Sequence, residues 1–150
     1  MASEPLGSPV LQVFGMIRLI DNGVREQIAE SLPKGLSVPQ YEMMRLFDFK
    51  GDGMTPAEIA QTLNVPKSGV TAILQHLEAS GYVRVEPCPD DGRRKRVWLT
   101  DAGREIYITT VTAIRPKMEK LREAFTMEEF REALPFLRAL QIWFAERDWA

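Results

Sequence analysis

The sequence predicts a mainly helical fold of the α+β type, in which one β-hairpin interrupts a series of helices. Three observations support this prediction. A serine or threonine followed three residues later by glutamine or glutamate marks helix starts at Ser37, Thr55 and Thr126. Two short helical segments are separated only by a turn at Asn64. The helical period then gives way to alternating apolar and polar residues after Gly81.

Length and composition are those of an ordinary globular protein. The chain has 150 residues, of which 45% are hydrophobic and 27% charged, which is enough for one compact domain with a buried core. The single cysteine, Cys88, cannot form an intramolecular disulfide. The first residues lack the pattern of a secretion signal, and no stretch approaches the roughly 20 apolar residues of a membrane span. We therefore expect a cytoplasmic protein with no membrane partner.

The helices before the hairpin follow in order. Apolar residues recur at helical spacing over residues 10–31. The capping pattern at Ser37 opens a second helix, which should end near Gly51. A third, short helix runs from Pro56 to about Leu63, with proline at the first position, where its missing N–H costs nothing. Three helices are therefore expected before the first tight turn.

A fourth helix opens at Pro66 and runs to about Glu78. Its apolar residues fall on one face, at i, i+3, i+4 and i+7: Val70, Ile73, Leu74 and Leu77. Gly81 supplies the stop after it. The third and fourth helices, joined by a tight turn, form a helix-turn-helix candidate.

The segment after Gly81 predicts a β-hairpin. Residues 82–86 and 96–99 alternate in polarity, and Asp91-Gly92 between them is a typical hairpin turn. A hairpin directly after a helix-turn-helix is a wing. The expected fold is therefore a winged helix-turn-helix.

Two helices follow the hairpin. Thr100-Asp101 caps a long helix that ends shortly before Thr126, and Pro116 in its interior predicts a kink. The last helix starts at Thr126, and Pro135 predicts a bend within it. These helices lie outside the helix-turn-helix and the wing.

The charge is unevenly distributed along the chain. The net charge is −2, but residues 66–104 carry seven Lys and Arg against five Asp and Glu, whereas the rest of the chain carries twelve against sixteen. The basic residues gather at Arg93-Arg94-Lys95-Arg96. This distribution permits DNA binding without requiring it.

One local motif has a specific pattern. It consists of Asp91-Gly92-Arg93, followed by Val97-Trp98-Leu99-Thr100 and then Gly103. The motif resembles the wing signature of the MarR family, and the order of helices resembles that family along essentially the whole chain. The resemblance implies a single MarR-type domain over residues 1–150, with a winged helix-turn-helix DNA-binding lobe at 36–100 and dimerisation helices at 10–31 and 101–148.

The fourth helix is the expected recognition helix. With its apolar face turned inward, five residues face outward: Lys67, Ser68, Thr71, Ala72 and Gln75. Gln75 can pair with an adenine edge, and Thr71 and Ala72 can touch thymine methyl groups. Lys67, near the start of the helix, can take a phosphate or a guanine. These residues are the predicted major-groove contacts.

The wing carries the other predicted contacts. Arg93 lies at the predicted tip, where it is suited to enter a minor groove, and Arg94, Lys95 and Arg96 are expected to contact phosphates. The family resemblance implies that Asp91 orients the wing arginine without touching DNA.

Two positions depart from the family pattern. Many MarR relatives have serine where Pro66 stands and arginine where Ala72 stands. The alanine removes one expected DNA contact, so the operator sequence stays open.

The residue patterns do not support other chemistry. The sequence has no glycine-rich phosphate loop, no Ser/His/Asp order and no carboxylate pair in a predicted cleft, so we expect neither an enzyme nor a cofactor. His76 is the only histidine, which argues against a metal site. Cys88 lies in the wing, whereas the sensor cysteines of some relatives lie in the N-terminal helices. The inert interpretation of Cys88 is therefore favoured over an oxidation sensor.

Some apolar and aromatic side chains are compatible with an effector pocket. MarR relatives bind phenolic effectors between the DNA-binding lobe and the dimerisation helices. The candidates here are Met16, Ile20, Tyr41, Met44 and Phe47, together with Met43 and Phe49. A plain hydrophobic core is an equally good interpretation of these residues.

The first and last helices carry more apolar surface than a single lobe requires. The candidates for the seam of a two-fold dimer are Phe14, Ile17, Phe130, Leu134, Leu137 and Trp143. We therefore expect a homodimer that binds pseudo-palindromic duplex DNA and regulates transcription, as a repressor more often than an activator. Release by a small aromatic or phenolic effector is one option. The alternative is a non-catalytic winged-helix module for protein interaction or dimerisation that does not bind DNA.

Overall fold

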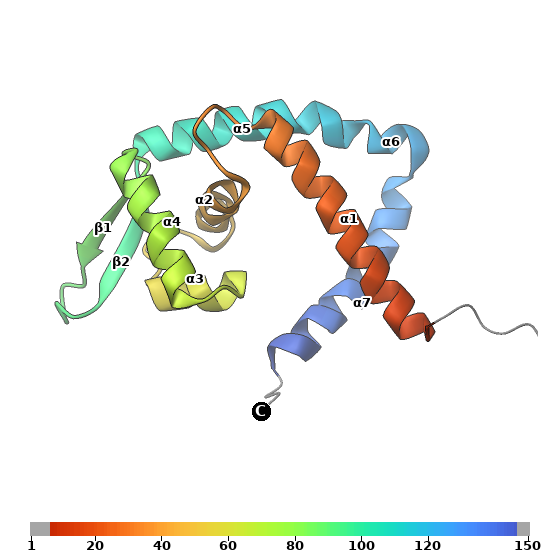
Figure 1. The fold of residues 1–150 in the computed structure, drawn as a ribbon, viewed down its shortest axis with the longest axis horizontal. Helices are drawn as coiled ribbons and strands as arrows, with labels where there is room; N and C mark the ends of the chain where they lie inside the picture. Colours follow the sequence, from red (N-terminus) through yellow and green to blue (C-terminus); the bar gives the residue numbers. More distant parts are fainter. Residues whose placement is uncertain (1–6, 147–150) are drawn as a thin grey trace, which may run out of the picture. The chain divides into compact units, whose positions relative to one another are not determined.

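The computed structural model describes residues 7–146, apart from the side chains of residues 49 and 50 (Figure 1). Contacts within the chain divide it into two units, residues 1–114 and 115–150, and each is described by itself. The first six residues, the end of the predicted helical range 101–148 and the Phe49 side chain lie outside the described residues.

The first unit contains the predicted helices before the hairpin. They are α1 (Pro9–Ser31), α2 (Val38–Lys50), α3 (Pro56–Leu63) and α4 (Lys67–Ala79). The capping boxes at Ser37 and Thr55 are both formed, with the side chain and the backbone of each cap bonded to the third helical residue. The expected order and limits of these helices are confirmed to within one residue at most ends.

The predicted hairpin is also confirmed. Strands β1 (Val83–Pro87) and β2 (Lys95–Leu99) pair antiparallel, with Val85 opposite Val97. Helix α5 (Asp101–Glu119) begins directly after β2. The arrangement is a winged helix-turn-helix followed by a long helix (Figure 1).

A short segment that the sequence does not predict pairs with the wing. The N–H of Gly53 donates to the carbonyl of Val97 at 3.0 Å, and the N–H of Val97 donates to the carbonyl of Met54 at 2.8 Å. Gly53 has a φ of 81°, which a side chain would disfavour. The loop between α2 and α3 thereby covers the free edge of β2.

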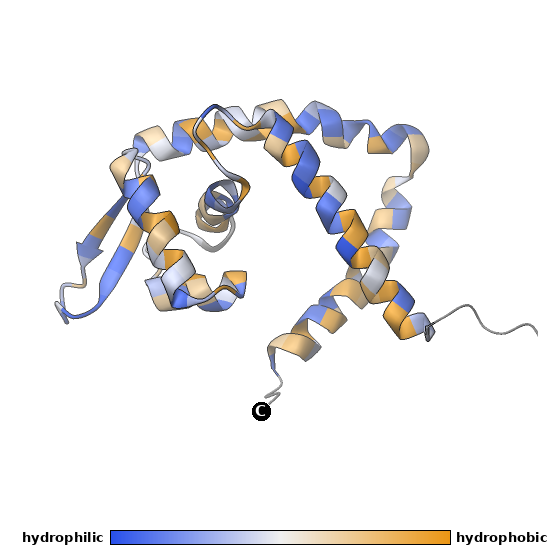
Figure 2. Ribbon diagram, viewed as in Figure 1, coloured by the Kyte–Doolittle hydropathy of each residue, from blue (hydrophilic) through white to orange (hydrophobic). Residues whose placement is uncertain are grey.

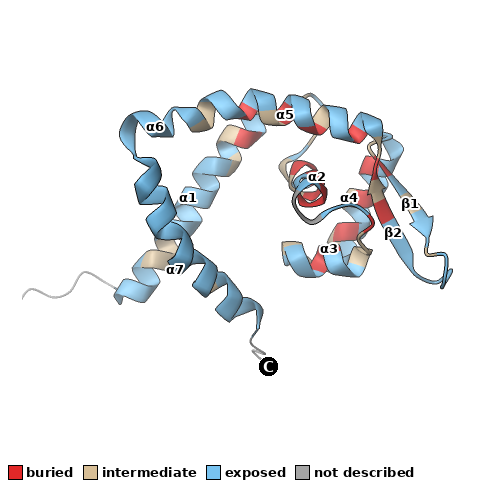
Figure 3. Ribbon diagram, turned by 180° about the vertical axis from the view of Figure 1, so that it is seen from behind, coloured by how far each residue is buried: buried red, intermediate tan, exposed pale blue. Residues whose placement is uncertain are grey.

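The core of the first unit lies between the helix-turn-helix, the wing and α5. Its fully buried side chains are Met43, Met44, Ile59, Leu77, Val70, Val97 and Thr110. Figure 3 shows the buried positions gathered on the inner faces of these elements. The apolar face predicted for α4 is the face that packs inward.

The second unit contains the end of α5, α6 (Leu121–Ala124) and α7 (Met127–Ala145). The single helix expected to run almost to Thr126 is interrupted at Lys120, which is a correction. The backbone turns more tightly there than in an α-helix, because the N–H of Glu123 donates to the Lys120 carbonyl only three residues back, at 3.1 Å. The capping box at Thr126 is formed as predicted.

Helix α7 presents apolar residues without burying any of them. Phe130, Leu134 and Leu137 are each more than 40% exposed, and Figure 2 shows apolar residues along the helix. Despite this apolar character, none of the helices described combines the length and hydropathy needed to cross a membrane.

Candidate nucleic-acid interface

The recognition helix α4 separates a packed face from an exposed face. Val70, Leu74 and Leu77 are buried, whereas the five residues predicted to face outward are all exposed: Lys67, Ser68, Thr71, Ala72 and Gln75. The hydroxyl of Thr71 donates to the Lys67 carbonyl at 3.0 Å. This bond uses the only hydroxyl hydrogen of Thr71, so its methyl group and oxygen lone pairs remain for an outside contact.

The turn before α4 sets the direction of the recognition helix. Asn64 ends α3 in the left-handed conformation, with a φ of 52° and a ψ of 49°, which asparagine tolerates better than most residues. Pro66 is the N-cap residue of α4 and makes no side-chain cap bond. The helix therefore starts without the capping bond that a serine would supply.

The tip of the wing is shaped by Asp91. Its carboxylate accepts the backbone N–H of Arg93 at 3.0 Å, and its carbonyl accepts the N–H of Arg94 at 3.0 Å. The N–H of Cys88 closes the turn on the carbonyl of Arg94 at 2.8 Å. Asp91 thus fixes the backbone that carries Arg93, which supports its predicted role.

A hollow of about 520 Å³ brings four of the predicted DNA contacts together. Lys67 comes from the start of α4, while Arg93, Arg94 and Lys95 come from the wing. Among the described residues of the lining, the one carboxylate belongs to Glu58, and it accepts the backbone N–H of Thr55 at 2.9 Å in the capping box. These residues supply four cations against one anion, which favours an anionic ligand.

Helix α3 contributes residues to this hollow that the sequence reasoning missed. They are Thr55, Pro56, Ala57, Glu58 and Gln61. Nothing in their spacing marks them as contacts, because only the folded wing places them opposite its cations.

Arg96 differs from its three basic neighbours. Its guanidinium donates to the Gly53 carbonyl at 2.8 Å, and in the strand register it lies opposite Glu86. Side chains alternate between the two faces of a strand, so Arg96 and Lys95 point to opposite faces of the wing. Arg96 therefore braces the loop before α3 and does not line the hollow.

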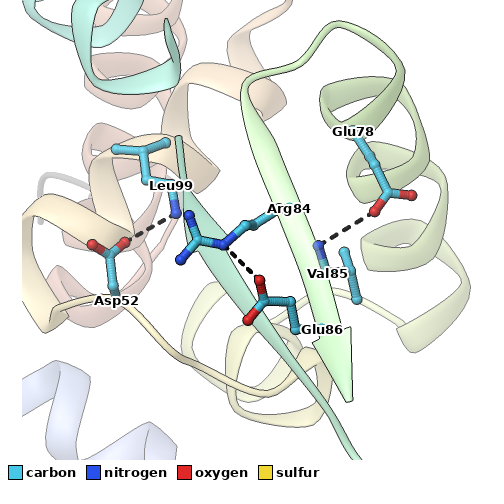
Figure 4. Close-up of polar contacts among 6 residues, drawn as sticks. All are labelled: Asp52, Glu78, Arg84, Val85, Glu86 and Leu99. Carbon is cyan, nitrogen blue, oxygen red and sulfur yellow. Dashed lines mark hydrogen bonds and ion pairs between the residues drawn. The ribbon is translucent and has the colours of Figure 1, made fainter. Parts of the chain in front are cut away.

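The wing is held by further polar contacts, and Figure 4 shows those of Asp52 with Leu99 and of Arg84 with Glu86. The Asp52 carboxylate accepts the N–H of Leu99 at 3.1 Å and forms an ion pair with Arg104 at 3.0 Å. On the exposed side, Arg84 pairs with Glu86 at 2.8 Å. Asp52 thus ties β2 and α5 to the loop before α3, whereas the Arg84–Glu86 pair lies within β1.

The structure explains the spacing between Leu99 and Gly103 in the wing motif. The Thr100 hydroxyl donates to the Gly81 carbonyl at 2.6 Å and accepts the N–H of Gly103 at 3.0 Å. The N–H of Thr100 donates to the Tyr82 carbonyl at 3.0 Å. The motif therefore joins the end of the recognition helix to the start of α5.

The predicted effector residues fall into two environments. Tyr41, Met44 and Phe47 are buried in α2, as is Met43, whereas Met16 and Ile20 are 56% and 63% exposed on α1. The hollow described above, and a second one of about 360 Å³ around Arg25, Arg45 and Leu63, have other linings. The effector pocket stays a prediction.

Cys88 and His76 are not among the residues that line the hollow of Lys67 and the wing. Cys88 is half-buried as a free thiol, and His76 is exposed on α4. Within residues 7–146, no group of three or more His, Cys, Asp or Glu is arranged to hold a metal ion.

Two tyrosines pack where α2 meets α5. The rings of Tyr41 and Tyr107 are stacked with centroids 5.8 Å apart, and the Tyr107 hydroxyl donates to the Asp48 carboxylate at 3.4 Å. Burial, reinforced by the negative charge of Asp48, raises the pKa of Tyr107 to about 12. Burial also raises the pKa of Tyr41.

The raised pKa predicts a loss of stability in alkali. An unfolded tyrosine ionises near pH 10 (about 10 in model peptides), whereas folded Tyr107 keeps its proton until its pKa of about 12. The unfolded state therefore binds fewer protons in this window, and the free energy of unfolding should fall as the pH rises through it. Urea unfolding at a series of pH values should show a shallower fall for Tyr107→Phe than for Tyr82→Phe. Equal slopes would contradict the prediction.

The chain is similar in sequence to known transcriptional regulators. A family model described as the MarR family matches residues 34–94. YetL, an HTH-type transcriptional repressor of Bacillus subtilis, is 29% identical over 97 residues, which cover 64% of this chain and 58% of YetL. Mb2911, an HTH-type transcriptional repressor of Mycobacterium bovis, is 25% identical over 136 residues, which cover 91% of this chain and 93% of Mb2911. The matched region thus spans little more than half of YetL and most of Mb2911.

A solved structure shares the fold. It is a cysteine-to-serine variant of MarR from Escherichia coli in complex with operator DNA, with a TM-score of 0.78, 21% identity, and coverage of 91% of this chain and 99% of that chain. The wing motif, the matched family model and the shared fold agree with one another. Residues 34–94 thus match the MarR family of winged helix-turn-helix transcriptional regulators, and the chain has the fold of a MarR protein.

Proposed function

We propose that the protein binds duplex DNA as a symmetric homodimer and regulates transcription as a repressor. The observation that carries this proposal is the hollow in which Lys67 of the recognition helix meets Arg93, Arg94 and Lys95 of the wing. A phosphate backbone that passes between a major-groove helix and a minor-groove wing would lie in such a cationic hollow. The names of YetL and Mb2911 as repressors, and the operator DNA bound to the MarR variant, support the same function.

The dimer part of the proposal rests on exposed apolar surface. Ile17 on α1 is 38% exposed, and Leu137 on α7 is 42% exposed. They are two of the seven large apolar residues that are exposed on α1 and the eight that are exposed on α7. Exposed apolar surface of this extent is typical of protein interaction sites. A two-fold dimer would present two recognition helices about one helical turn of DNA apart, to a pseudo-palindromic site.

The effector part of the proposal concerns a small aromatic or phenolic compound. Such a ligand would change DNA affinity only by binding one spacing of the two recognition helices better than another. Tyr41, Met44 and Phe47 remain the candidate residues from α2 for this effector. The DNA-binding function would place the protein in the cytoplasm.

In vitro selection from a random duplex library tests the proposal directly. We expect the wild-type protein to enrich a pseudo-palindrome, and to bind it more weakly as the salt concentration rises, because bound phosphates release counterions. Sedimentation should show a dimer at micromolar concentration. Failure to bind any duplex at low salt would overturn the proposal and favour a protein interaction module.

Gln75→Ala is expected to relax specificity at one base pair. A glutamine amide can bond the N6 and N7 atoms of adenine together, which contributes about 1–3 kcal/mol of discrimination. On the selected duplex, replacing the contacted A·T pair by G·C should weaken the wild-type protein about tenfold and Gln75→Ala hardly at all. Competition binding with base-substituted duplexes measures both. An equal loss for the two proteins at every position would exclude Gln75 as a base contact.

A further inference from the structure

The wing has two outer strand edges, and carboxylates from the rest of the lobe bind both. At the edge of β2, Asp52 accepts the N–H of Leu99 at 3.1 Å. At the edge of β1, Glu78 accepts the N–H of Val85 at 3.3 Å. Figure 4 shows the two contacts on opposite sides of the hairpin. The two carboxylates come from different elements, because Asp52 lies in a loop, whereas Glu78 belongs to the recognition helix itself.

Glu78 is placed to link the two DNA-contacting elements. It lies three residues after Gln75, about one helical turn further along α4. A hollow of about 420 Å³ between α4 and the wing is lined by Gln75 and Glu78 on one side and by Val85 and Lys95 on the other. The contact between Glu78 and Val85 therefore spans a space that packing does not fill.

The position of an acidic residue here has an electrostatic disadvantage. Glu78 is exposed, and a carboxylate close to a phosphate backbone opposes binding. Any favourable contribution of Glu78 to DNA binding would then come from the hydrogen bond that it accepts from the Val85 N–H. A wing whose position is fixed before binding loses less conformational freedom when Arg93 enters a minor groove.

We propose that Glu78 is a positioning residue, which fixes the wing relative to the recognition helix and so couples the Arg93 contact to the Gln75 contact. This inference rests on the proposed DNA-binding function. The side chain acts through the backbone of β1 and does not need to touch DNA.

Two substitutions at Glu78 separate position from charge. Glu78→Gln keeps an oxygen that accepts the Val85 N–H but loses the negative charge, so it should bind the selected duplex as tightly as wild type or more tightly. Glu78→Ala loses the acceptor as well, and should bind about three- to tenfold more weakly. Glu86→Gln removes the same charge from the other face of the wing and should behave like Glu78→Gln. Fluorescence anisotropy gives the affinities.

The coupling itself is tested in the Arg93→Ala background. If Glu78 acts by placing the wing, Glu78→Ala should have little further effect once Arg93 is gone. Hydroxyl-radical footprinting should show weaker minor-groove protection with Glu78→Ala and unchanged protection with Glu78→Gln, even if the alanine variant is less stable. An undiminished effect of Glu78→Ala without Arg93, or wild-type affinity of Glu78→Ala, would overturn the inference. Failure of the wild-type protein to bind any duplex at low salt would instead refute the proposed function.

Discussion

Gly103→Ala is expected to cause a large loss of stability. Gly103 is buried at the third position of α5, and a Cβ built there would lie 2.0 Å from the Tyr82 carbonyl oxygen and 2.8 Å from a Leu99 methyl carbon. The first of these atoms is backbone and already accepts the N–H of Thr100. Relief of the clash therefore requires α5 to move away from the wing.

The expected cost is about 3 kcal/mol or more, since overpacking against backbone cannot be relieved by a rotamer change. This corresponds to a fall in melting temperature on the order of 10 °C. Gly69→Ala is a matched control, because Gly69 is the third residue of α4 and has no atom within 4 Å of a built Cβ. It should stabilise the helix by about 0.5–1 kcal/mol. Thermal unfolding followed by circular dichroism should show a lower melting temperature than wild type for Gly103→Ala and a higher one for Gly69→Ala. Similar melting temperatures for the two variants would contradict the prediction.

Much of the fold could be predicted because its signals are local. The capping boxes at Ser37, Thr55 and Thr126 depend on residues three apart, and all three are formed. The switch from helical to alternating polarity at the wing is likewise a short-range pattern. The buried face of α4 determines which residues are exposed on the opposite face, so the exposure of Lys67 and Gln75 could be predicted without knowledge of the tertiary structure.

The parts that escaped prediction depend on contacts distant in sequence. Gly53 pairs with Val97, and Asp52 with Leu99, across more than forty residues. The bond of the Arg96 guanidinium to the Gly53 carbonyl also joins distant residues, and the basic run to which Arg96 belongs does not reveal it. A run of like residues on a strand divides between two faces, and only the register shows which members lie together.

Arg93→Ala is expected to cause the largest loss of DNA affinity of the single substitutions in the wing. Arg93 is exposed at the tip, its backbone is held by Asp91, and its side chain lines the hollow beside Arg94 and Lys95. An arginine in a narrow minor groove gains from the enhanced negative potential there, beyond what a phosphate contact gives. We expect binding to the selected duplex to weaken about 10- to 100-fold.

The control for lost charge is Arg45→Ala. Arg45 is equally cationic and exposed, but it lines the separate hollow around Arg25 and Leu63, so its removal should weaken binding about twofold at most. Specificity separates the two explanations more sharply than affinity. Replacing flanking A·T pairs by G·C widens the minor groove and adds an amino group to it. This change should weaken the wild-type protein and leave Arg93→Ala almost unaffected. If both proteins lose affinity equally on the altered flank, Arg93 contributes only its charge, and the wing reads the phosphate backbone without reading the groove.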